Sequence, residues 1–358
     1  MHSGQPDTSD LGNSAWPPRS QDSVSAGAAR VRYAQSISYE AMISGISRGH
    51  YEQTPPENGA AMTLPITHTV AAPGAVLTYD VREPETPSEH RPLFIFGSPM
   101  GASGFEQLAS HFGDRTVITY DPRGMERSTR EPDSELTAEV HAEDYHRVIE
   151  ATRLGPVDAF GSSGGGMCAL HWVVAHPEDV RTLVSHEPPL VALLEDREMA
   201  MKVNADIVDT YQREGFGPAM AKFIQLVMRQ SPLPDDYLDQ PAPDPAQFGL
   251  PTEDDGSRDD LLLSGNLAMP PFVPDAGALR ASPVRLIPAI GALGEGGLAR
   301  RGGEALATLL GVEPVIFPGD HGGFAANEWS PGNDPAAFAA KLKELLDEPH
   351  IRAAQAQA

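Results

Sequence analysis

The sequence contains a single cysteine, Cys168, among 358 residues. One thiol excludes a disulfide framework and any zinc site built on several cysteines. Basic residues are also scarce, because 26 Lys and Arg stand against 50 Asp and Glu and give a net charge of −24. A surface this acidic repels phosphate backbones and anionic lipids, so we expect neither a nucleic acid nor a membrane among the partners.

Long hydrophobic runs are missing as well. No stretch approaches the roughly 18 apolar residues of a membrane-spanning helix, and the N-terminal residues MHSGQPDTSD lack the basic and apolar regions of a secretory signal. We therefore expect a soluble, cytoplasmic protein. The length allows two domains or one large α/β domain with an insertion. Hydrophobic residues make up 40% of the chain, which is enough for a buried core.

What the sequence does have, from residue 62 onward, is an alternation of short apolar runs with helical stretches. Runs that are apolar throughout are typical of strands covered on both faces, so the alternation predicts an α/β fold with a mostly parallel sheet and helices on both faces. The expected strands span residues 62–71, 75–81, 93–96, 116–120, 157–160, 182–185, 285–290 and 315–317, and the expected helices span residues 137–154, 165–175, 298–310 and 335–346.

The chain divides into parts of different composition. Residues 1–60 are rich in Ser, Gly, Pro and Gln and are expected to form a flexible or peripheral extension, with residues 349–358 as a tail. The α/β core is expected to comprise residues 61–187 and 284–348. Residues 188–283 hold no convincing strand and are expected to form a helical cap inserted into the core.

Two helices are expected within the cap, at residues 199–211 and 218–228. The second carries apolar residues at i, i+3, i+4, i+7 and i+8, which is the spacing of an amphipathic stripe. We interpret this stripe as a packing face. Its methionine and phenylalanine side chains are also the one hint that the substrate is apolar.

The sequence Gly161-Ser162-Ser163-Gly164-Gly165 follows an expected strand and opens an expected helix. In a Gly-x-Ser-x-Gly pattern, a sharp turn strains the central residue and exposes its hydroxyl, and the flanking glycines avoid collisions across the turn. The dipole of the new helix favours negative charge that develops beside it. Ser163 is therefore the candidate nucleophile.

A serine hydroxyl is a weak nucleophile until a base takes its proton. His321 lies in the sequence PGDHGGF, just after the last expected strand, where small neighbours allow the ring to reach into a cleft. The other histidines lie on helical or polar segments or beside the candidate acid. His321 is therefore the candidate general base.

A carboxylate is needed to orient and stabilise the imidazole. Glu187 follows the strand after the nucleophile helix, and Glu295 follows the next strand, so both keep the chain order Ser, acid, His. We favour Glu187, because Glu295 lies several residues past its strand in a glycine-rich turn. Asp320 is adjacent to His321 and can hardly reach the far ring nitrogen.

Two backbone N–H groups are expected to form an oxyanion hole. One belongs to Gly164, the residue after the nucleophile. The other is expected from the turn after the strand at residues 93–96, where Ser98 is preferred and Met100 is the alternative, since Pro99 has no N–H.

Together these pieces resemble the α/β-hydrolase superfamily across residues 62–348. Residues 96–99 (Phe-Gly-Ser-Pro) stand where many members have His-Gly-x-Pro. Residues 121–124 (Asp-Pro-Arg-Gly) match the family's Asp-x-Arg-Gly turn, in which we interpret the Asp and Arg as structural. The Ser163 turn matches the nucleophile elbow, and His321 matches the terminal histidine loop.

The resemblance implies an eight-stranded, mostly parallel sheet with a cap after the sixth strand, and hydrolysis through an acyl-enzyme on Ser163. The sequence departs from the family pattern at two positions. Phe96 replaces the usual histidine, and the usual acid position after the penultimate strand falls on the apolar Leu293, which favours Glu187 as the acid.

The expected substrate is a small-molecule carboxylic ester or lactone. A C–C bond hydrolase, a cofactor-free haloperoxidase or perhydrolase, and a non-catalytic ligand-binding member of the same fold remain alternatives, and the oligomeric state stays open.

No cofactor and no metal ion are expected. Residues 294–299 fit a dinucleotide pattern, but no acidic residue ends the following strand. His141, Asp144 and His146 lack zinc-hydrolase spacing, and we interpret them as part of a solvated helix face.

Overall fold

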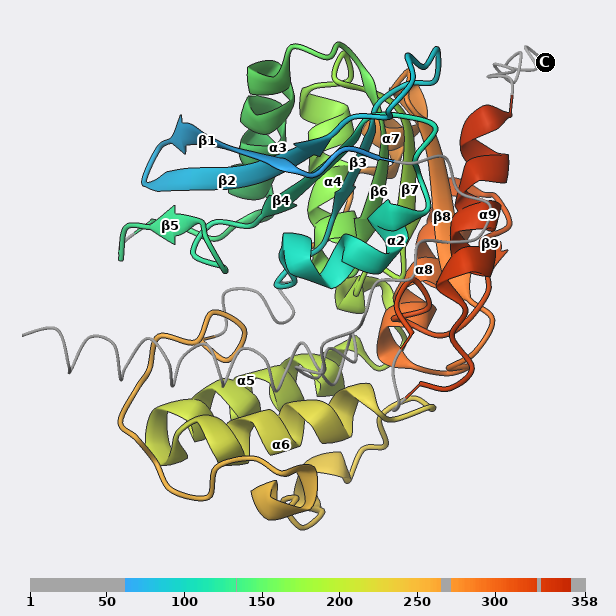
Figure 1. Cartoon of the computed structure of the whole chain (residues 1–358). Helices are drawn as coiled ribbons and strands as arrows, with labels where there is room; N and C mark the ends of the chain where they lie inside the picture. The colour runs from blue at the N-terminus through green and yellow to red at the C-terminus, as the bar shows by residue number, and fades with distance from the viewer. Residues whose placement is uncertain (1–61, 133, 265–271, 327–329, 349–358) are drawn as a thin grey trace, which may run out of the picture.

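The computed structural model describes residues 62–132, 134–264, 272–326 and 330–348. The predicted N-terminal extension and C-terminal tail lie outside these ranges. The described residues form a mixed sheet with helices on both faces and a separate helical layer, as Figure 1 shows. No helix among them is long and apolar enough to cross a membrane.

The sheet has the strand order β1-β2-β4-β3-β6-β7-β8-β9, with the short β5 paired to β2. The strands β1, β2 and β4 pair antiparallel, and every pairing from β4 to β9 is parallel. The mostly parallel sheet of eight main strands is therefore confirmed. The strands are β1 (Ile66–Ala72), β2 (Ala75–Arg82), β3 (Leu93–Phe96), β4 (Val117–Asp121), β5 (Thr129–Arg130), β6 (Val157–Ser162), β7 (Val180–His186), β8 (Arg285–Gly291) and β9 (Val315–Phe317).

Alternate residues of the central strands enter two different cores. Phe94 and Phe96 of β3 pack against aromatic side chains of α3 and α4, whereas Leu93 and Ile95 enter the cluster formed with α2 and α9. Both faces of the sheet are thus covered, which explains why its strands are apolar throughout. The α-helices are α2 (Glu106–Ser110), α3 (Ala138–Thr152), α4 (Gly164–Ala175), α5 (Arg197–Glu214), α6 (Phe216–Val227), α7 (Ala276–Ala281), α8 (Leu298–Leu310) and α9 (Pro335–Asp347).

The chain between β7 and β8 forms the helical layer expected after the sixth main strand. Helices α5 and α6 pack against each other below the sheet in Figure 1 and have an apolar cluster of their own. Met220 and Phe223 of the predicted stripe lie inside this cluster, with 1% and 6% of their surface exposed. Most of the stripe is therefore a packing face, although Met228 at its end is 65% exposed, and it no longer indicates an apolar substrate.

Three short elements were not expected from the sequence, namely β5, α2 and α7. Strand β5 has two residues, paired with Ala75 and Val76 of β2, and α2 and α7 have five and six residues. Elements this short do not complete two turns or a run of alternating residues, so they leave no periodic signal in the sequence.

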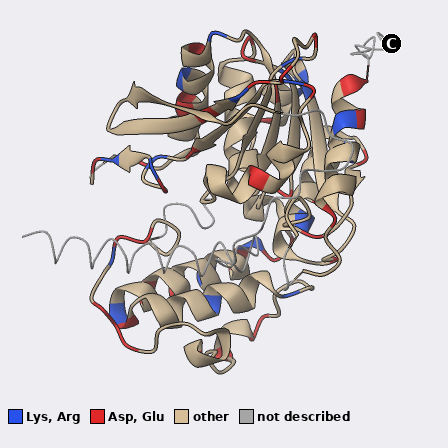
Figure 2. Ribbon diagram, viewed as in Figure 1, with Lys and Arg blue, Asp and Glu red and all other residues tan. Residues whose placement is uncertain are grey.

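Acidic and basic residues are interspersed along the loops and helices in Figure 2. Within the part of the chain that the structure describes, the ion pair between Arg123 and Asp144 is buried on both sides. Arg123, in the turn after β4, donates to both carboxylate oxygens of Asp144 on α3, at 2.6 and 2.5 Å, and to the carbonyl of Pro73 in the β1–β2 turn. Arg123 therefore has the structural role predicted for it. Asp144 is fully buried and His141 is 1% exposed, so the interpretation of this helix face as solvated was wrong.

We predict that Asp144→Asn lowers the free energy of unfolding by about 3–5 kcal/mol, because it leaves the Arg123 guanidinium buried without a counter-charge. Urea unfolding monitored by circular dichroism measures this. The matched control is Asp209→Asn, which removes a solvent-exposed partner of Arg213 and should leave stability essentially unchanged. Equal effects of the two substitutions would contradict the prediction.

Candidate active site

Ser163 is the single residue between β6 and α4. Its backbone has φ 55° and ψ −129°, and its N–H donates to the carbonyl of His186 at 2.9 Å. A positive φ is rare for a residue with a side chain and costs conformational energy. The turn therefore holds Ser163 in the strained geometry expected from the sequence, and the residue is only partly buried.

The glycines around Ser163 are required by close backbone contacts. A Cβ on Gly161 would lie 3.0 Å from the Cα of Gly166 across the turn. A Cβ on Gly165 would lie 2.8 Å from the Cα of Gly97, in the loop after β3. Side chains at these positions would push the turn open or move that loop away from α4.

His321 and Glu187 are in direct contact. His321 Nδ1 lies 2.8 Å from Glu187 Oε2, and Glu187 Oε1 accepts the N–H of Gly291 at 2.8 Å. Glu187 is 2% exposed, whereas 28% of the His321 side chain is exposed. The carboxylate is thus fixed by both of its oxygens, and the imidazole keeps Nε2 free of this contact.

Ser163 leaves the sheet beside this pair. Strands β6 and β7 are parallel, and Ser162 is in register with His186, so Ser163 and Glu187 are the next residues of neighbouring strands. The loop that carries His321 follows β9 at the same carboxyl edge of the sheet. The three residues singled out in the sequence therefore follow strands that end at the same edge of the sheet, and Glu187 and His321 are in contact there.

The pKa of His321 is raised above its ordinary value. Burial lowers it, but the hydrogen bond to Glu187, the charge of Glu187 and the charge of Asp320 together raise it more. The pKa of Glu187 is lowered: burial raises it, and the hydrogen bond and positive charge of His321 outweigh that effect. The pair therefore favours an ionised Glu187 that stabilises an imidazolium at His321.

Asp320 braces the loop that carries His321. Its carboxylate accepts hydrogen bonds from the N–H of Gly322, from Ser330 and from the side-chain amide of Asn333, and Asn333 accepts the N–H of Asp320 in return. These contacts hold the Asp320 carboxylate to the loop residues around it. The sequence analysis missed this brace, and its only signal was an acidic residue next to the candidate base.

Glu295, the alternative acid, lies on the surface in the turn before α8. Leu293, two residues earlier, is also exposed, and the N–H of Leu293 donates to the carbonyl of Gly319. Among the hydrogen bonds of the described residues, the carboxylate that contacts the His321 ring is that of Glu187.

The two candidate oxyanion donors lie in touching segments. A Cβ on Gly164 would lie 2.7 Å from the carbonyl oxygen of Ser98, so the loop after β3 contacts the start of α4. Among the hydrogen bonds of the described residues, none uses the amide N–H of Ser98 or of Gly164.

His186 lies behind the Glu187–His321 pair. It is fully buried among Phe160, Phe317 and Phe338, and this burial lowers its pKa to about 4. His186 is thus buried from solvent, behind the candidate base.

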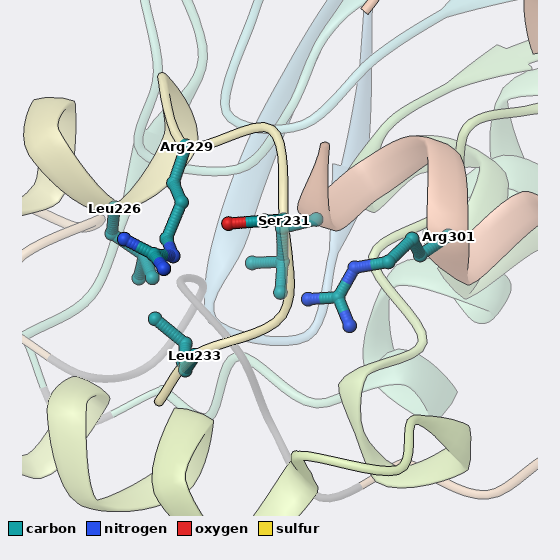
Figure 3. A pocket seen from close by; sticks show the side chains of 6 residues that line it. Leu226, Arg229, Ser231, Leu233 and Arg301 are labelled. Carbon is teal, nitrogen blue, oxygen red and sulfur yellow. The ribbon is translucent and has the colours of Figure 1, made fainter. Parts of the chain in front are cut away.

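A hollow at the surface lies between the end of α6 and the start of α8 (Figure 3). It has no room for a water-sized sphere, so it is too tight for a substrate. Arg301 of α8 reaches across it and donates to both oxygens of Asp196, which also accepts the N–H of Leu233. The Arg301–Asp196 ion pair therefore connects α8 to the helical layer next to this hollow.

The comparisons with known proteins agree with this architecture. The model of the alpha/beta hydrolase fold matches residues 93–259. The uncharacterized hydrolase YraK of Bacillus subtilis is 29% identical over 288 residues, which cover 78% of this chain and 96% of YraK.

Two solved structures share the fold at low sequence identity. The enol-lactonase of Burkholderia xenovorans superimposes with a TM-score of 0.54 at 16% identity, over 78% of this chain and all of the other. A thermophilic esterase from Thermogutta terrifontis superimposes with a TM-score of 0.51 at 18% identity, over 79% of this chain and 98% of the other. The chain belongs to the α/β-hydrolase fold superfamily, and we class it as a hydrolase.

We predict that an NMR titration finds the pKa of His321 above the ordinary value of 6.5. Glu187→Gln should lower it, because the substitution removes the negative charge that stabilises the imidazolium while it keeps the size of the side chain. Glu295→Gln is the control and should leave the titration unchanged. An unshifted titration in Glu187→Gln would show that Glu187 does not set the basicity of His321.

Proposed function

We propose that the protein is a serine hydrolase that cleaves a carboxylic ester or a lactone through an acyl-enzyme on Ser163. The observation that carries this proposal is the 2.8 Å contact between Glu187 and His321 at the sheet edge where the strained Ser163 turn lies. A nucleophile, a base and a carboxylate that orients the base are the parts that acyl transfer requires.

In the proposed reaction, His321 Nε2 takes the proton of the Ser163 hydroxyl as its oxygen attacks the substrate carbonyl. The amides of Ser98 and Gly164 hold the oxyanion of the tetrahedral intermediate, with the N-terminal dipole of α4 behind them. His321 then gives the proton to the leaving alcohol. Water activated by the same ring hydrolyses the ester on Ser163, and Glu187 keeps the imidazole in the correct tautomer throughout.

We also propose that residues 188–283 act as a cap over this site, inserted between core residues 61–187 and 284–348. The insertion begins directly after Glu187, so its first residues are anchored at the proposed catalytic edge. Loops and helices at this edge of an α/β sheet select the ligand in proteins of this architecture.

A fluorophosphonate probe tests the nucleophile. We predict that it labels Ser163 in the folded protein, that Ser163→Ala abolishes labelling, and that Ser163→Ala lowers ester turnover by at least about 10³-fold. Ser162→Ala is the matched control, since this neighbouring hydroxyl is fully buried and has no hydrogen-bond partner among the described residues. Absence of labelling in folded wild-type protein would favour a non-catalytic, ligand-binding role.

The pH dependence tests the base. Only the neutral His321 ring accepts a proton, so kcat/KM should fall as the pH decreases through the pKa of His321, with a midpoint above 6.5. In Glu187→Gln the midpoint should move to lower pH and turnover should fall by about 10²- to 10⁴-fold. Glu295→Gln should leave both unchanged. Loss of turnover in Glu295→Gln alone would overturn the assignment of the acid.

A panel of substrates separates the proposal from the alternatives on the same fold. Simple esters of increasing chain length and lactones of increasing ring size should give turnover that depends on Ser163. A C–C bond hydrolase would act on a diketone and leave these compounds intact. A perhydrolase would need peroxide for its activity.

A further inference from the structure

Two histidines lie face to face far from the proposed active site. The rings of His146 on α3 and His176 at the end of α4 have centroids 3.8 Å apart and planes only 8° apart. Helix α4 runs from the Ser163 turn to His176, and its rise of 1.5 Å per residue separates the two ends by about 18 Å. The proposed reaction therefore leaves this pair unexplained.

Each of these rings has a carboxylate at one nitrogen. His146 Nδ1 lies 2.8 Å from an oxygen of Asp179, which also accepts the indole N–H of Trp172 at 2.9 Å. His176 Nε2 lies 2.8 Å from an oxygen of Glu143. A carboxylate in this position holds the hydrogen on the nitrogen that it faces, so a neutral ring presents the lone pair of its other nitrogen.

A third group stands next to the open nitrogen of His176. An oxygen of Glu178 lies 3.6 Å from His176 Nδ1, and one ligand atom each from His146, His176 and Glu178 lie within 4.8 Å of one another. Two ligands of a tetrahedral zinc ion, bound at about 2.0–2.2 Å, are roughly 3.3 Å apart. The three side chains are thus close enough to share one ion once the stacked rings turn so that their nitrogen lone pairs converge on it.

The cluster is open to solvent and electrostatically suited to a cation. The side chains of His146 and His176 are 25% and 19% exposed, and that of Glu178 is 66% exposed. A neutral imidazole offers the lone pair of one ring nitrogen to a metal ion, whereas a protonated ring offers none. The net charge of −24 also raises the concentration of cations at the surface.

We propose that His146, His176 and Glu178 bind one transition-metal ion of the zinc class, with water completing its coordination. Asp179 and Glu143 orient the two imidazoles. Imidazole nitrogen selects zinc and similar ions over magnesium, which prefers oxygen ligands. The ion joins α3 to the end of α4, so its role is to brace the helix that begins at Ser163.

Calorimetric titration of the full chain with zinc chloride tests the site at neutral pH. We expect one saturable site in the wild type and in the control His171→Gln, which alters a histidine of α4 outside the cluster. His146→Gln, His176→Gln and Glu178→Gln should each lose that site. Asp179→Asn should weaken it by about 10- to 100-fold. Magnesium chloride should produce no saturable binding.

Thermal unfolding provides a second readout. Zinc that binds only the folded chain should raise the midpoint of the wild type and of His171→Gln, but not that of His146→Gln or His176→Gln. Cooperative unfolding of each variant without zinc checks that it folds. Unchanged zinc binding in the ligand variants would place the ion elsewhere, and no binding by the wild type would leave the cluster as plain ion pairs. Either result overturns the proposal.

Discussion

The tight backbone packing around the Ser163 turn determines where helix α4 and the loop after β3 can lie. A single strained residue joins β6 to α4, and no side chain fits at Gly161 or Gly165, because the backbones of Gly166 and Gly97 are already in contact distance. This packing fixes the start of α4, and the loop after β3 lies directly against it. The Glu187–His321 pair can lie beside the serine only because parallel pairing ends β6 and β7 at the same level.

Much of the fold could be predicted because its strands are covered on both faces. The strand at residues 93–96 was predicted to the residue, since all four side chains are buried. The short β5 could not be predicted. Its two residues pair with β2 through a contact that forms only once the sheet exists, and neither hydrophobicity nor turn residues mark it in the sequence.

The candidate site was predictable where local sequence determines local geometry, as at Ser163 and in the small-residue loop of His321. The choice between Glu187 and Glu295 depended on three-dimensional contacts, because both follow a strand and only one is sealed against the imidazole. The face of α3 was misjudged for a similar reason. From the sequence, Asp144 is expected to face solvent. Its burial depends on the ion pair with Arg123, which comes from a turn distant in the sequence.

Glu187 is also the last residue before the helical insertion, and its positive φ of 45° bends the chain out of β7. The carboxylate that contacts the imidazole and the segment that leads to α5 therefore share one short stretch of backbone. Any displacement of the insertion relative to the sheet pulls on this stretch first. Under the function proposed above, a ligand that shifts those helices would therefore also shift the Glu187–His321 contact.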